Sequence, residues 1–167
     1  PEDTKVKSFG AYCFYNSTAL KTVEFPNTVE SLGGSFFYEC SDLLTVVLPE
    51  NNKFTTLPSR LFYKCYKLGN VNLSDKITVI NSDAFLQCYA MTEINLPPNL
   101  KTLATQALYG CRSVKSVVVP NGVKSIGENT FYDCQALEYL EISSGTTYLA
   151  YGAINTCPIL KTLCIKC

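Results

Sequence analysis

The strongest constraint on this 167-residue chain is an internal repeat with a step of 23 residues. The segments Leu32–Cys40 and Ile126–Cys134 share one order of residue types: an aliphatic residue, four spacers, Phe-Tyr, an acidic residue and Cys. Every step is 23 residues except one of 25, and self-similarity at such a period is typical of a solenoid. The opening position of the repeat recurs at Phe9, Leu32, Leu57, Ile80, Leu103, Ile126 and Leu149.

Each repeat contains one short stretch with the periodicity of a strand. Val23 and Phe25 are apolar and alternate with Thr22 and Glu24, which places one set of side chains inward and the other outward. Only a few residues per repeat follow this alternation, so each repeat is expected to contribute one short strand. Strands that recur at this step can pair only in parallel, and a crossover must return the chain to the start of the next strand.

The segment 33–40 is expected to form this crossover. Apolar residues around it, Leu32, Phe37, Cys40 and Leu43, are five, three and three residues apart. Such spacing suits a short helical or 3₁₀ turn better than a full helix. We therefore expect helical turns on the side of the coil that lies opposite the strands.

The repeats together predict the architecture of the chain. We expect residues 1–167 to form one domain, an α/β-type solenoid of seven repeats wound in a right-handed coil. One parallel β-sheet would line its concave side, and stacking would bury the inward face that one repeat cannot bury alone. Residues 1–6 keep the spacing from proline to apolar residue found after Pro49, so we interpret the chain as a slice of a longer array.

Composition disfavours several classes of function. Lys and Arg number 14, as do Asp and Glu, so a formal net charge of zero gives no electrostatic attraction for nucleic acid or an acidic membrane surface. The absence of His removes the commonest general base and metal ligand at neutral pH. No apolar run approaches the roughly 20 residues that span a bilayer, so we expect no membrane insertion by this segment. We also expect no catalytic site and no cofactor.

The order of residue types resembles that of a known repeat family. The segment Val119–Gly127, which reads Val-Pro-Asn-Gly-Val-Lys-Ser-Ile-Gly, is similar to the consensus of the BspA-like (Treponema pallidum type) leucine-rich repeats. The resemblance covers about residues 6–165 and departs from the pattern at Ser17, Leu108 and Ile154, among other positions. It implies a leucine-rich-repeat solenoid. It also implies a place among large cell-surface proteins of bacteria and parasitic protists, where the family is associated with adhesion.

Six cysteines occupy one column of the repeat. Because Cys is small and among the most buried residue types, we interpret this column as a ladder of free thiols inside the coil. Neighbouring thiols would be about 5 Å apart, so a disulfide along the ladder is the alternative, whereas a linear ladder does not suit a tetrahedral metal site. The predicted ladder consists of Cys40, Cys65, Cys88, Cys111, Cys134 and Cys157.

Other cysteines and a column of tyrosines lie outside this ladder. Cys13 is isolated, and Cys164 with Cys167 forms a C-x-x-C pair that we interpret as incidental, with a disulfide to another repeat or chain as the alternative. The tyrosines follow the Phe column and predict a stacked aromatic row on the convex side, or else an outer surface for adhesion or lateral assembly. They are Tyr15, Tyr38, Tyr63, Tyr109 and Tyr132.

The outward side chains of the strands predict the binding surface. They are small, polar and variable, include three Glu and no Lys or Arg, and suit a protein or glycan better than a phosphate group. Solenoids bind through extended concave sheets, and a solvated face without a partner is the alternative. The predicted binding residues are Thr22, Glu24, Thr45, Val47, Asn70, Asn72, Glu93, Asn95, Ser116, Val118, Tyr139 and Glu141, and the columns continue at Thr162 and Cys164.

These observations predict a non-catalytic scaffold that binds a protein or glycoprotein partner on its concave sheet, as part of a cell-surface adhesin-type protein. Flanking repeats or capping partners would cover the ends of the stack, because solenoids need polar caps. The alternative is an intracellular structural or assembly component that uses the array as a spacer or docking platform. Glycosylation sequons at Asn16 and Asn72 are consistent with the surface location.

Overall fold

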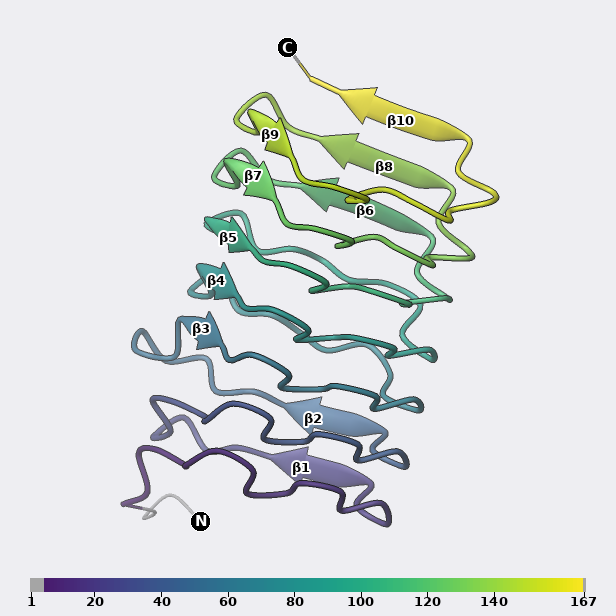
Figure 1. The fold of residues 1–167 in the computed structure, drawn as a ribbon. Coiled ribbons are helices and arrows are strands. Elements are labelled where there is room, and N and C mark those ends of the chain that lie inside the picture. Colours follow the sequence, from purple (N-terminus) through teal and green to yellow (C-terminus); the bar gives the residue numbers. More distant parts are fainter. Residues whose placement is uncertain (1–4, 167) are drawn as a thin grey trace.

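The computed structural model describes residues 5–166, which wind into a stack of coils with parallel strands lying one above another (Figure 1). The strands fall into two columns. The first column holds the longer strands β1 (Thr22–Glu24), β2 (Thr45–Val47), β6 (Ser116–Val119), β8 (Tyr139–Ile142) and β10 (Thr162–Ile165). The second column holds the short strands β3 (Thr56–Leu57), β4 (Val79–Ile80), β5 (Thr102–Leu103), β7 (Ser125–Ile126) and β9 (Tyr148–Leu149).

Within residues 5–166 the strands form three sheets, so the prediction of a single sheet is wrong. In the first column β1 pairs with β2, and β10, β8 and β6 form a separate sheet. The second column is a five-stranded sheet in the order β3-β4-β5-β7-β9. The register follows the repeat, with Val23 opposite Val46 and Leu140 opposite Leu163. Sequence reasoning overlooked the second column because strands of two residues are too short to show an alternating pattern.

The crossovers contain no helix within residues 5–166, so the prediction of helical turns is also wrong. Each crossover has two positions in the left-handed backbone region, such as Ser35 with φ 55° and Glu39 with φ 57°, and these interrupt any right-handed helix. The N–H groups of Ser35 and Glu39 donate to the carbonyl oxygens of Ser59 and Tyr63, both at 2.8 Å. These two hydrogen bonds link neighbouring coils, whereas the N–H groups of Tyr38 and Cys40 donate within the crossover, to the carbonyls of Ser35 and Phe37.

The core runs along the axis of the stack between the two strand columns and the crossovers. Phe37, Phe62 and Phe85 are fully buried, and their rings follow one another at centroid distances of 5.6 and 5.3 Å. Burial depends on having a coil on both sides. Leu140 of β8 is 0% exposed, whereas its equivalent Leu163, on the edge strand β10, is 45% exposed.

Candidate functional site

The outward side chains of the longer strands and of the segments between them form one surface, which we call the long-strand face. It consists of the twelve predicted binding residues from Thr22 to Glu141. All of them are exposed except Tyr139 and Glu141, which are half-buried. The Tyr139 hydroxyl donates to the Glu141 carboxylate, which also forms an ion pair with Lys166 at 3.5 Å. The outward side chains therefore remain available to a partner over most of this face.

The long-strand face is interrupted in its middle. Segments 70–73 and 93–96 lie between β2 and β6 in the sequence and adopt no strand. Where the strands pair regularly, the backbone carbonyl just before each strand accepts two hydrogen bonds from backbone N–H groups of the next coil. The Lys115 oxygen accepts from the N–H groups of Glu138 at 2.8 Å and Tyr139 at 3.2 Å. This arrangement changes at the interruption.

Asn70 replaces that carbonyl with its own side chain. Its Oδ1 accepts from the backbone N–H groups of Thr92 at 3.0 Å and Glu93 at 3.2 Å, and from the Thr92 hydroxyl at 3.3 Å. Asn is depleted in strands because its side chain competes with the backbone for hydrogen bonds. The asparagine therefore separates the two-stranded sheet from the three-stranded sheet.

Two adjoining hollows open at the interruption. The first has a volume of about 170 Å³ and is lined by Asn70, Val71, Asn72, Glu93 and Asn95. The second, of about 300 Å³, is lined by Ile94, Asn95, Leu96, Pro98, Ser116, Val118 and Pro120. Asn95 lines both, so the two form one depression, polar at one end and more apolar at the other. The side chains of Asn72, Glu93 and Asn95 have no hydrogen bond or ion pair within the described chain.

The six cysteines of the predicted ladder lie in one column, and each thiol donates to a backbone carbonyl of the preceding coil. The distances from sulfur to oxygen run from 2.9 Å at Cys40 to 3.5 Å at Cys134. All six thiols are free, and all are buried except Cys157, which is half-buried. Burial raises the pKa of Cys88 well above its ordinary value and that of Cys111 to about 12. The buried thiols are therefore protonated at neutral pH and pack as small apolar groups.

Two further cysteines of the described range, Cys13 and Cys164, lie outside the ladder. Cys13 is exposed, and its thiol donates to the carbonyl of Gly10 at 3.1 Å. Cys164 is half-buried on β10, and Cys167, the other half of the C-x-x-C pair, lies outside the described residues. Residues 5–166 contain no cluster of three or more His, Cys, Asp or Glu side chains that could hold a metal ion. In the same range no helix has the length and apolar character that crossing a membrane requires.

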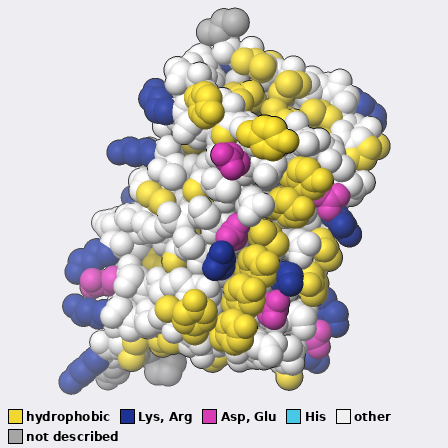
Figure 2. All heavy atoms as spheres, viewed as in Figure 1, with side chains coloured by type: hydrophobic (Ala, Val, Ile, Leu, Met, Phe, Trp, Pro, Cys, Tyr) yellow, Lys and Arg dark blue, Asp and Glu magenta, His cyan; other side chains and the backbone are white. Residues whose placement is uncertain are grey.

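The tyrosine column forms two stacks on the crossovers. The rings of Tyr15, Tyr38 and Tyr63 follow one another at centroid distances of 5.0 and 4.4 Å. Tyr109 and Tyr132 stack separately at 4.9 Å. Hydrophobic side chains gather in a band that runs along the stack (Figure 2). The stacked tyrosines cover one another's ring faces, so they offer a partner mainly ring edges and hydroxyl groups.

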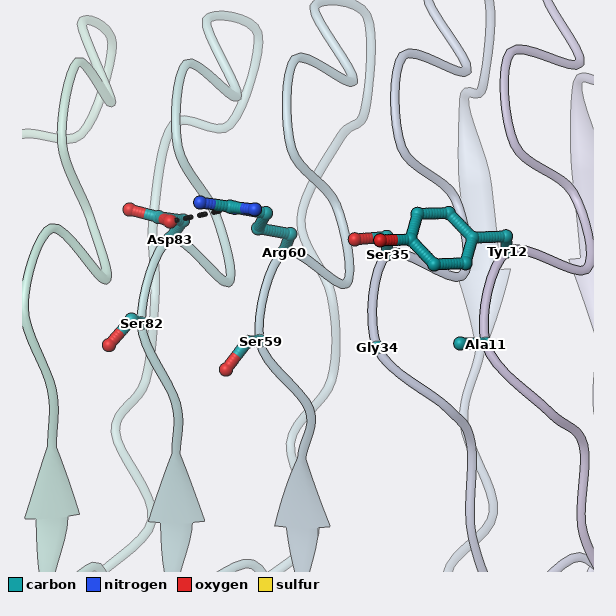
Figure 3. Close-up of a pocket in the computed structure, with 8 residues that line it drawn as sticks. All are labelled: Ala11, Tyr12, Gly34, Ser35, Ser59, Arg60, Ser82 and Asp83. Carbon is teal, nitrogen blue, oxygen red and sulfur yellow. Dashed lines mark hydrogen bonds and ion pairs between the residues drawn. The ribbon is translucent and has the colours of Figure 1, made fainter.

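Sequence reasoning missed a polar pocket at the start of the crossovers. It has a volume of about 330 Å³ and includes Tyr12, Ser35, Arg60 and Asp83 in its lining (Figure 3). Arg60 Nε and Asp83 Oδ2 form an ion pair at 3.1 Å. The sequence does contain one indication of this pocket. Arg60 and Asp83 carry opposite charges 23 positions apart, and the repeat places residues at that separation on neighbouring coils.

Comparison with known proteins agrees with this geometry. The sequence model of the BspA type leucine rich repeat region, with six copies, matches residues 2–115 and 55–167. A leucine-rich repeat protein of T. pallidum has a TM-score of 0.85 and 24% identity, over 96% of this chain and 75% of that one. A Bacteroides ovatus leucine-rich repeat protein has a TM-score of 0.74 and 20% identity, over 87% of this chain and 41% of that one.

A third solved structure is a leucine rich cell surface protein of Faecalibacterium prausnitzii, with a TM-score of 0.57 and 22% identity over 96% of this chain. This chain spans 43% of that protein. No protein with a curated function matches the sequence. Six copies in the matched model do not support the predicted count of seven repeats. Because the family model covers nearly every residue and the coils have the geometry of its solved relatives, the chain belongs to the BspA-type leucine-rich repeat family.

Proposed function

We propose that the chain is a non-catalytic scaffold that holds a protein or glycoprotein partner on the long-strand face, within a cell-surface adhesin-type protein. The depression at the interruption carries this proposal. Asn72, Glu93 and Asn95 present donors and acceptors there that nothing else in the described chain uses. Unpaired polar groups in a concave surface recognise a partner by hydrogen bonding, and an unsuitable partner would leave them unsatisfied.

The rest of the long-strand face suits a broad protein contact. Val47 and Val118 are exposed large apolar side chains near the two ends of the interruption. Protein interfaces combine apolar contacts with hydrogen-bonding groups, and this face has both within one row of strands. Each coil adds only one pair of outward side chains, so the free energy of binding would be spread over many weak contacts.

The location and surroundings of the scaffold are part of the proposal. The description of the Faecalibacterium neighbour as a cell surface protein supports a surface location. The exposed apolar side chains Leu163 and Ile165 on β10 support flanking repeats or a capping partner at that edge. In this proposal the chain is one slice of a longer array, and its partner is not a nucleic acid.

An intracellular assembly component is the second candidate. The free, exposed thiol of Cys13 favours it, because exposed cysteines in secreted proteins are usually paired or oxidised. Under that alternative the array would be a spacer docked between other proteins. Titration of thiols in protein taken from its native compartment separates the two hypotheses. A reactive Cys13 thiol favours the intracellular assembly component, and a Cys13 thiol that is paired or oxidised favours the cell-surface scaffold.

Two matched double variants test the long-strand face. We expect Asn72→Lys with Glu93→Lys to weaken binding to immobilised extracellular-matrix glycoproteins by about tenfold or more, measured by biolayer interferometry. The control, Glu50→Lys with Asn52→Lys, makes the same change in charge in the loop after β2 and should alter affinity less than twofold. The proposal would be contradicted if both double variants lost the same amount of affinity. It would also be contradicted if the wild type bound none of the immobilised glycoproteins.

A further inference from the structure

The polar pocket at the start of the crossovers, which we call the crossover pocket, is built by four successive coils. Each coil contributes a small residue followed by a residue with positive φ. The pairs are Ala11–Tyr12, Gly34–Ser35, Ser59–Arg60 and Ser82–Asp83. The small residues leave the space of the pocket open. The residues with positive φ carry the aromatic, hydroxyl and charged side chains, which lie in one row along the stack (Figure 3).

Two polar residues in this pocket are almost fully buried, although the side chain of Asp83 alone is 12% exposed. Ser35 is 5% exposed, and its hydroxyl has no hydrogen bond with any of residues 5–166. Asp83 is 8% exposed and uses Oδ2 for Arg60, while its Oδ1 has no partner in the same range. Neither oxygen is sealed from solvent, because no fully buried side-chain nitrogen or oxygen atom within residues 5–166 lacks a hydrogen bond. Both are therefore open to water in the pocket, and polar atoms of a ligand can take the place of that water.

The charges in the crossover pocket indicate a neutral ligand. The Arg60 guanidinium and the Asp83 carboxylate neutralise each other, and the remaining lining is uncharged. An anion would meet the Asp83 carboxylate, and a cation would meet the guanidinium. Only Nε of Arg60 is used in the ion pair, so its other N–H groups are free to donate beside the free Oδ1 acceptor. A pair of adjacent hydroxyl groups, which both donate and accept, matches that arrangement.

The ring of Tyr12 adds an apolar side to the same pocket. It is 58% exposed and extends along the row toward Ser35, at the opposite end from Asp83 (Figure 3). Sugar rings combine hydroxyl groups on their edges with C–H faces that pack on aromatic rings. The volume of about 330 Å³ lies at the small end of the range for ligand pockets, which suits one sugar unit rather than a long chain.

We propose that the crossover pocket binds one neutral sugar residue of a glycan. Arg60 and Asp83 would hold two adjacent hydroxyl groups, the Ser35 hydroxyl would bond a third, and Tyr12 would pack against the C–H face. This site uses none of the residues of the long-strand face. The sugar site and the protein-binding face can therefore be tested separately.

The test is saturation-transfer NMR on the whole chain with methyl glycosides of glucose, galactose, mannose and N-acetylglucosamine, and with the methyl glycoside of sialic acid as an anionic probe. We expect at least one neutral glycoside to bind with a dissociation constant of about 1 mM. Ser35→Ala and Tyr12→Ala should each weaken that binding about fivefold or more while leaving the Arg60–Asp83 ion pair in place. Arg60→Ala should abolish it.

The matched control is Arg112→Ala, which breaks the Arg112–Asp133 ion pair of 2.8 Å outside the crossover pocket and should leave sugar binding unchanged. Thermal unfolding of each variant confirms that it is folded. The proposal is overturned if no neutral glycoside binds, if only the sialic acid probe binds, or if Ser35→Ala and Tyr12→Ala bind as the wild type does. Any of these results would leave the proposed protein-binding function untouched, since its test uses other residues.

Discussion

At the scale of single residues, the cysteine column shows how one position can serve both packing and hydrogen bonding. Cys65 and Cys88 are fully buried, yet their thiols reach the carbonyls of Phe37 and Phe62 at 3.1 and 3.3 Å. A larger apolar residue would not fit between stacked coils, and alanine would leave the carbonyl with one partner fewer. The thiol is small enough for the first demand and polar enough for the second.

The raised thiol pKa values predict how stability changes with pH. The folded pKa of Cys88 and Cys111 lies above the ordinary value of 9.0, so their contribution to stability is complete below pH 9 and is lost as pH rises toward the folded pKa. Replacing both by Ala should flatten the decline in unfolding free energy between about pH 9 and 11, by up to about 1.4 kcal/mol per pH unit for each thiol. Urea denaturation across this range measures it.

Val114→Ala is the control for this prediction. The Val114 side chain is buried in the same core but carries no titratable group, so its removal should leave the pH dependence as it is in the wild type. An equally steep decline in the double variant and the wild type would show that the buried thiols do not titrate with unfolding.

At the scale of the element, the crossovers pack their backbones closely. A Cβ placed on Gly33 would collide with the backbone of Gly10 and Ala11 in the preceding coil, whereas one on Gly34 would lie 3.4 Å from its nearest neighbour, the Ser59 oxygen. Two adjacent glycines therefore have different roles. The first permits close stacking of the coils, and the second has room for a side chain.

Alanine at each of these glycines tests the close stacking. We expect Gly33→Ala to lower the free energy of unfolding by about 2 kcal/mol, because the coils must move apart. Gly34→Ala should change it by less than about 1 kcal/mol. Chemical denaturation of both variants provides the comparison, and a Gly34 variant as unstable as the Gly33 variant would refute the explanation.

The elements also show where reasoning from sequence succeeded and where it could not. The 23-residue period correctly predicted that Val23, Val46 and Leu140 lie in strands, because the same apolar position recurs in the same structural environment in every repeat. The left-handed backbone conformations of Ser35 and Glu39 were not predicted, since these residue types give no sign of a positive φ. Positive φ is uncommon for such residues, so nothing in an apolar pattern distinguishes the observed turns from 3₁₀ turns.

The candidate site was predictable only in part. Outward strand residues such as Asn72 and Asn95 follow from alternation, but the loss of pairing at Asn70 depends on one side chain competing with one carbonyl. The crossover pocket depends on Ser35 and Asp83 being buried beside a turn, which requires the neighbouring coils to be in place.

At the scale of the whole molecule, each coil is stabilised by its neighbours. Leu140→Ala should therefore lower the free energy of unfolding by about 2–4 kcal/mol, because the residue is fully buried between β6 and β10. Leu163→Ala, in the same column on the edge strand, should cost less than about 1 kcal/mol, since 45% of that side chain is already exposed. Urea denaturation of both variants measures the difference, and similar losses would argue against stabilisation by nearest neighbours.

The Asn70 side chain accepts the hydrogen bonds that a backbone carbonyl accepts in the regular coils, and this has a mechanical consequence for the stack. Between β2 and β6 the long-strand side lacks a regular ladder, while β3, β4 and β5 remain paired on the other side. A bending load on the array would therefore meet less resistance on one side than on the other. We expect the rod to flex about its short strands, widening the central depression when a bound partner is pulled.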